Sequence, residues 1–160
     1  MIIITQISHE PWLTWYTDDE WQSLIDAIIH KTLKVVDWGK SSEISVLLAD
    51  DACSKELNRD YRKKDSPTNV LSFPSFTKEE LENACDKQQP IMLGDIVLSL
   101  ETVLKEAKGQ GKPFLNHVTH LIVHGTLHLL GYDHMEDAEA DEMEALEILV
   151  LKELNIGNPY

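Results

Sequence analysis

The stretch "PFLNHVTHLIVHGTLHLLGYDH", Pro113 to His134, predicts the central helix of the fold and the point where it ends. Pro113 suits the first turn of a helix, because no intrahelical amide bond is needed there. Apolar residues recur through Leu130, and Gly131 is a typical helix terminator. We therefore expect a long helix around which the rest of the chain packs.

Three histidines of this stretch have the spacing of a metal site. His124 and His128 are four residues apart, so both imidazoles project from one face of the helix and can hold one cation. The turn after Gly131 can bring His134 to the same point. Three neutral nitrogen ligands suit Zn²⁺ and leave a fourth position open for water, which is typical of catalytic zinc. Asp133 is expected to orient a ligand histidine from outside the site.

Two further histidines and one glycine bear on what this site does. His117 and His120 fall on the same helix face as His124 and His128. They can serve as extra ligands, acid/base groups or supporting partners, but we favour a polar seam that lines a cleft and has no direct role. Gly125 stands where the zinc-peptidase pattern H-E-x-x-H has its glutamate. The usual peptidase base is therefore missing, and we expect Gly125 to open space over the metal.

Strands and helices are interleaved along the rest of the chain. Gly94 within the fourth strand indicates a bulge or a close backbone approach. There is no regular βαβ repetition and no glycine-rich nucleotide turn, so we expect an α+β fold, with one small mixed sheet packed with about five helices in a single domain of residues 1–160. The expected strands are 2–7, 43–49, 69–73 and 91–100, and the other expected helices are 18–36, 51 to the basic stretch, 101–108 and 137–154.

Local details complete this expectation. Residues 77–90 are expected to be partly loop, and the fourth helix to end at Gly109 and Gly111. In the last helix, the residues expected to pack inward are Met143, Leu146, Leu149 and Val150.

Composition narrows the function classes. The chain has 160 residues, of which 42% are hydrophobic and 26% charged, and a formal charge of −14 that argues against nonspecific coating of nucleic acid. The segment "KELNRDYRKK", Lys55 to Lys64, is nonetheless basic and can face phosphate, or can be a solvated helix face. Cys53 and Cys85 have no metal or disulfide spacing and are expected to pack. The N-terminus lacks the features of a signal peptide and no run suffices to span a bilayer, so we expect a cytoplasmic protein without membrane contact.

The motifs "LNRDYRKKDSPTNVLSFP", "LGDIVLS" and "HGTLHLLGYDH" resemble those of the YbeY family of bacterial metal-dependent endoribonucleases, from about Glu43 to Leu151. The resemblance implies single-strand-specific RNA cleavage in 3′-end maturation of small-subunit ribosomal RNA and in ribosome quality control. It also implies that His124, His128 and His134 bind the metal. It implies, too, that His124 and Arg59 are required for activity.

The physical chemistry of the basic segment agrees with this implication. The guanidinium of Arg59 can neutralise charge that develops on phosphorus, while the neighbouring Arg62, Lys63 and Lys64 either guide the RNA backbone or form a solvated helix end. Two further pairs have open roles. Tyr61 and Phe73 can stack on bases, although core packing is favoured, and the carboxylates of Asp95 and Asp65 can serve a site or bond local amides.

We expect one zinc ion per chain, with nickel or another divalent metal as the alternative. The expected partners are single-stranded RNA, ribosomal RNA, and the small ribosomal subunit with its assembly proteins. Two rival interpretations remain: a zinc hydrolase of another bond, such as a peptide, and a non-catalytic ribosome assembly factor with a structural metal.

Overall fold

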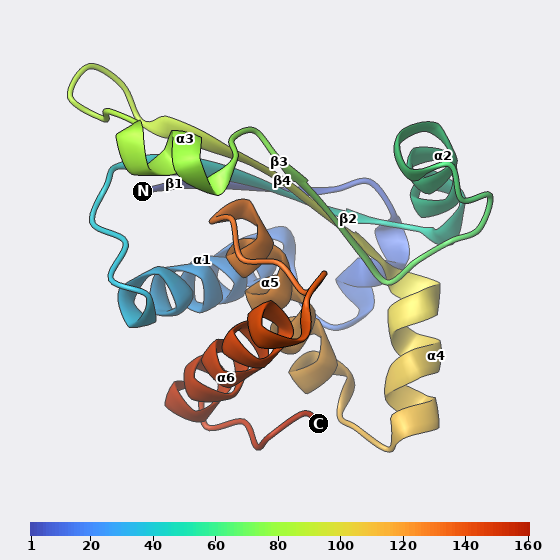
Figure 1. Ribbon diagram of the computed structural model, residues 1–160. Helices are drawn as coiled ribbons and strands as arrows, with labels where there is room; N and C mark the ends of the chain where they lie inside the picture. The colour runs from blue at the N-terminus through green and yellow to red at the C-terminus, as the bar shows by residue number, and fades with distance from the viewer.

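A four-stranded sheet crosses the molecule in the computed structural model, which describes residues 1–160 (Figure 1). Helices α1 and α5 lie against one face of this sheet, α6 packs on α1 and α5, and α2 lies on the other face of the sheet (Figure 1). The strands are β1 (Ile2–Ile7), β2 (Ser42–Ala49), β3 (Val70–Pro74) and β4 (Ile91–Ser99), and the helices are α1 (Asp18–Val35), α2 (Asp51–Arg62), α3 (Lys78–Asn83), α4 (Leu100–Gln110), α5 (Phe114–Leu129) and α6 (Asp137–Glu153).

The sheet is mixed, with the strand order β1-β2-β4-β3. β1 pairs with β2 and β2 with β4 in parallel, whereas β3 pairs antiparallel to β4 and forms one edge. Gly94 lies at the predicted irregularity: the β2–β4 register shifts beside it, and its φ is +138°. A Cβ at Gly94 would lie 2.1 Å from the carbonyl oxygen of Phe73, so the close backbone approach is confirmed. The expected α+β class, with one small mixed sheet, is confirmed.

Helix ends follow local side-chain chemistry. α1 begins with the capping box of Thr17 and Glu20 that its sequence favours. The same device, Thr77 with Glu80, starts α3 in a segment we expected to be partly loop. α4 continues past Gly109, contrary to the prediction, and ends at Gly111, where φ is +64°. The reason is that glycine lowers helix stability only modestly, whereas a left-handed residue ends the helix.

The core lies between the sheet and helices α1, α5 and α6, and 26 buried hydrophobic residues form one continuous cluster there. Two tryptophans belong to it: Trp12, in the short 3₁₀ helix Glu10–Thr14 that the sequence did not suggest, and Trp21. In α6 the prediction for Leu149 is wrong, because 46% of it is exposed. Met143 and Val150 are buried as expected, and the inward position between them belongs to Glu147.

The opposite face of the sheet carries α2. A small cluster of Ala49, Leu71 and Val97 packs there against Cys53 and Leu57. Cys53 packs as expected, whereas Cys85 is exposed, so its predicted packing is wrong. None of the helices combines the length and the apolar character needed to cross a bilayer.

Candidate metal centre

α5 places two imidazoles against each other. His124 and His128 lie one turn apart, and their ring planes meet at 86° with centroids 4.5 Å apart. Their Nε2 atoms are 3.0 Å from each other. Since the helix backbone holds both residues, this part of the site is rigid.

The turn after α5 brings in the third imidazole. Gly131 has φ +91°, and a Cβ there would lie 2.7 Å from the side chain of Lys78 in α3, so only glycine fits. Beyond it, Asp133 Oδ1 accepts the backbone N–H of His134 at 2.7 Å. The His134 ring lies 5.0 Å from that of His128 and 5.6 Å from that of His124. One nitrogen of each of the three histidines lies within 4.8 Å of the others.

Hydrogen bonds at Nδ1 determine which nitrogens face the centre. His124 Nδ1 lies 2.8 Å from the carboxylate of Glu147, and His128 Nδ1 lies 2.9 Å from the carbonyl oxygen of Tyr132. Both partners only accept, so both Nδ1 atoms donate. The two Nε2 lone pairs then face each other at 3.0 Å, an arrangement that a shared cation stabilises. The donor set therefore fits a divalent metal ion.

The protonation state of His128 favours the same conclusion. Burial, with repulsion from the protonated forms of His124 and His134, lowers the pKa of His128 to about 4. The imidazole is therefore neutral at pH 7 and available as a ligand.

Glu147 is the functional residue that the sequence reasoning missed. Its carboxylate is 1% exposed and accepts hydrogen bonds from His120 at 3.1 Å, from His124 at 2.8 Å and from Tyr160 at 2.5 Å. Burial raises the pKa of Glu147, but these three donors lower it more, to about 2. A signal was available: Glu147 is the one acidic residue among the buried positions of α6. A carboxylate at a core position requires partners.

Glu147, and not Asp133, bonds an imidazole nitrogen of the three-histidine cluster. Asp133 bonds the backbone of His134, and Asp95 lies on β4 in a groove on the α2 face of the sheet. The structure therefore shows no contact of Asp133 with an imidazole nitrogen, and Asp95 lies away from the three histidines. The reason is geometric, since the Nδ1 atoms of His124 and His128 point toward α6 and the turn.

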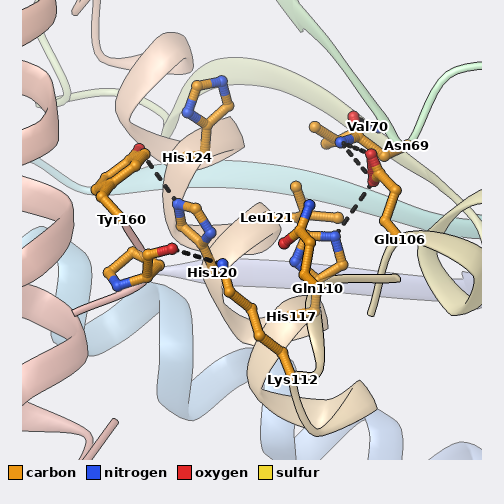
Figure 2. Close-up of a pocket in the computed structure, with 11 residues that line it drawn as sticks. Asn69, Val70, Glu106, Gln110, Lys112, His117, His120, Leu121, His124 and Tyr160 are labelled. Carbon is orange, nitrogen blue, oxygen red and sulfur yellow. Dashed lines mark hydrogen bonds and ion pairs between the residues drawn. The ribbon is translucent and has the colours of Figure 1, made fainter. Parts of the chain in front are cut away.

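His117 and His120 each contact a carboxylate beside the metal centre. Figure 2 shows them in a cavity of about 600 Å³ that His124 also lines. His117 Nε2 lies 3.2 Å from Glu106, and His120 Nε2 lies 3.1 Å from Glu147. The favoured interpretation, a polar seam lining a cleft, agrees with these positions.

Gly125 has a packing role, and the expectation that it opens space over the metal is wrong. It is buried, and a Cβ would lie 3.2 Å from both Ile96 and the hydroxyl of Ser72, so Gly125 allows α5 to approach the sheet closely. No carboxylate occupies this position to serve as a peptidase base. The H-E-x-x-H form of the peptidase alternative is therefore disfavoured.

The basic segment lies on the other side of the sheet. Arg59 is on α2, with its Nε 3.1 Å from Asp60, and the side chains at the helix end are exposed. Lys63 is the left-handed C-cap of α2, with φ +56°. The structure therefore does not bring Arg59, Arg62, Lys63 and Lys64 together with the three histidines. Asp65 lies just beyond this segment and pairs with Lys55 at 4.0 Å.

The aromatic pair next to this segment is less buried than expected. Tyr61 is 70% exposed, so the favoured core packing is wrong for it, because α2 covers only part of the sheet face. Its ring packs edge-on to Phe73 with centroids 5.3 Å apart, in a groove of about 450 Å³ that also contains Asp95. Both rings remain accessible at one wall of this groove.

The chain is similar to proteins of known family. It matches the family model described as "Endoribonuclease YbeY" over residues 6–155. A protein of that name from Paramagnetospirillum magneticum is 54% identical over 118 residues, which cover 74% of this chain and 71% of that protein. Another protein of that name, from Rhizorhabdus wittichii, is 43% identical over 155 residues, which cover 91% of this chain and 90% of that protein.

A solved structure supports the fold. The solution structure of TM1509 from Thermotoga maritima aligns with a TM-score of 0.58 over 96% of this chain and 92% of that one. At 22% sequence identity this likeness concerns the fold alone. The family match extends over nearly the whole chain, and several relatives share more than two fifths of their aligned residues with it. The chain therefore belongs to the endoribonuclease YbeY family, as the resemblance of its motifs indicated.

Proposed function

We propose that this member of an endoribonuclease family cuts single-stranded RNA, with His124, His128 and His134 as ligands of one zinc ion. The observation that carries the proposal is the pair of Nε2 atoms 3.0 Å apart, whose Nδ1 atoms are already bonded. Nickel or another divalent metal would suit the same three nitrogens. A bound divalent cation supplies Lewis acidity, which polarises phosphoryl oxygens and lowers the pKa of water.

The surroundings of the site suit cleavage within a strand. The cavity of about 600 Å³ lies on one side of the histidines, where Asn69 precedes β3 and Val70 begins it. A second hollow of about 400 Å³ lies on the other side, where His128 and Tyr132 face Pro74 at the end of β3. An RNA strand that follows β3 past the histidines can therefore continue in both directions, as an endonuclease requires.

Arg59 was expected to neutralise charge at the scissile phosphorus, but α2 places it across the sheet from the histidines, so we assign it to RNA binding near the cut. On the face of the sheet opposite the histidines, Arg59 suits a phosphate next to the scissile one, and the RNA brings that phosphate to Arg59 by passing around the edge strand β3. Its guanidinium stays charged and can exchange the exposed partner Asp60 for phosphate. Arg62, Lys63 and Lys64 are exposed where the chain leaves α2 for β3, and they extend the same phosphate path.

The proposed biological substrate is ribosomal RNA of the small subunit, at its 3′ end, with a further part in ribosome quality control in the cytoplasm. Family membership and the shape of the site support this proposal. The formal charge of −14 opposes unaided RNA binding, so the small subunit and its assembly proteins are proposed to hold the substrate in place.

The test pairs metal analysis with cleavage of a labelled single-stranded RNA. Wild type, Arg59→Ala, His124→Ala and the control Lys34→Ala, an exposed cation of α1, are compared after each is shown to be folded. We expect about one metal ion per wild-type chain and cleavage by wild type and Lys34→Ala alone. Equal cleavage by all four proteins would reveal a contaminating nuclease and refute the proposal.

A further inference from the structure

The cavity beside the metal centre is a separate feature with its own chemistry. α4, α5, the start of β3 and the C-terminal segment enclose it (Figure 2). Its volume of about 600 Å³ lies within the roughly 300–1,000 Å³ of small-molecule sites. Because His124 lines both the cavity and the metal centre, a group in the cavity lies next to any phosphate bound at the metal.

Two charged groups line the cavity: the carboxylate of Glu106, which is a partly exposed acceptor, and the ammonium of Lys112, which donates to the carbonyl oxygen of Pro159. The carboxylate of Glu106 accepts from Asn69 Nδ2 at 2.8 and 3.2 Å and from His117 at 3.2 Å, and it remains partly exposed. The amide oxygen of Asn69 is occupied by the backbone N–H of Val70. The partly exposed carboxylate of Glu106 repels a phosphate but suits a neutral group that donates hydrogen bonds.

The walls of the cavity suit a flat ring. Val70 and Leu121 supply apolar surface. Tyr160, 61% exposed, presents its aromatic ring, and its hydroxyl donates to Glu147 and so fixes the ring in place. Aromatic faces stack on nucleobases with little dependence on the base.

We propose that this cavity is a nucleobase subsite, which takes one unpaired base of the RNA next to the phosphate to be cut and bonds its donor edge to Glu106. The inference rests on the proposed function. It also gives a physical reason for acting on single strands, because a base can enter the cavity only when it is not paired in a duplex.

The test plugs the cavity without disturbing its polar contacts. Gln110 is the exposed last residue of α4 and lies at the rim, so Gln110→Trp fills the entrance. Lys108→Trp, on the same turn but outside the cavity, is the matched control. Binding of cytidine 5′-monophosphate and of ribose 5-phosphate, which lacks the base, is measured by calorimetry on zinc-loaded proteins, together with RNA cleavage.

We expect cytidine 5′-monophosphate to bind wild type and Lys108→Trp alike, and Gln110→Trp about 10-fold more weakly. Ribose 5-phosphate should bind all three proteins equally, and more weakly than the nucleotide binds wild type. Equal affinity of wild type for both probes, or unchanged nucleotide binding by Gln110→Trp, would overturn the subsite while RNA cleavage still supported the proposed function. If the wild-type protein binds the nucleotide more tightly than ribose 5-phosphate but cuts no RNA, the base subsite is supported and the proposed nuclease function is refuted.

Discussion

Replacing Glu147 should weaken metal binding although this carboxylate does not face the metal position. It accepts a hydrogen bond from Nδ1 of His124, which leaves Nε2 free to bind the cation. Without this acceptor, the His124 ring can take the other tautomer or rotate. Loss of a partner that orients a ligand histidine typically lowers metal affinity about 10- to 100-fold, or roughly 1.4 to 2.7 kcal/mol.

The two obvious substitutions should separate orientation from folding. Glu147→Gln keeps the volume and one acceptor oxygen but removes the charge, so we expect a loss of about 10-fold in affinity. Glu147→Ala leaves the partly buried His120 and His124, and the Tyr160 hydroxyl, without their shared acceptor. We expect a loss of about 100-fold in zinc affinity, and a loss of about 1 to 3 kcal/mol in the free energy of unfolding of the metal-free protein.

Zinc affinity is measured by competition with a chromophoric chelator, and stability by urea unfolding of the metal-free protein. Glu144→Gln, an exposed residue one turn earlier in α6, is the matched control and should change neither quantity. Wild-type zinc affinity in a folded Glu147→Gln or Glu147→Ala protein would refute the orienting role, whatever the loss of stability.

Three further predictions concern stability, each measured as the free energy or temperature of unfolding. Gly94→Ala should lower the free energy of unfolding by more than about 2 kcal/mol, because its Cβ would meet the Phe73 carbonyl and φ is positive there. Gly109→Ala, at a position within α4 whose Cβ would meet no other atom, should raise it by about 0.5 to 1 kcal/mol. The opposite order would contradict the packing described. Burial lowers the pKa of His117 below its ordinary 6.5, although Glu106 raises it, so its contribution to stability is present above pH 6.5 and is lost as the pH falls toward the lowered pKa. His117→Gln should therefore flatten the dependence of stability on pH below 6.5, and an unchanged slope would exclude His117 as its source. Chelation of the metal should leave the protein folded, because the continuous hydrophobic core does not include the metal centre. The free energy of unfolding should fall by about 2.7 kcal/mol, compared with protein in the presence of metal at 100 times its Kd. Unfolding on chelation would instead favour a structural metal.

The cluster of three histidines could be predicted from the sequence because its geometry is local. A helix places residues four apart on one face, and a glycine helix end returns the chain within a few residues, so His124, His128 and His134 required no knowledge of distant contacts. The strands and most helices followed from hydrophobic periodicity and capping for the same reason. The errors at Gly109 and in α3 were also local, where weak helix signals competed with glycine and polar loop composition.

The rest of the site depended on tertiary packing. Glu147 reaches His124 only because α6 packs against α5, and Glu106 reaches His117 only because α4 does, although 23 and 11 residues separate these pairs along the chain. Arg59 lies across the sheet from the histidines because α2 packs on that face, and the alternation of side chains along β4 places Asp95 on the same face. Neither position follows from the spacing of residues along the chain. The sequence by itself determined which atoms can bind a metal. The packing of helices on the sheet decided which acceptors orient those atoms and where a cavity lies beside them, because contacts between distant segments depend on how whole elements bury their apolar faces.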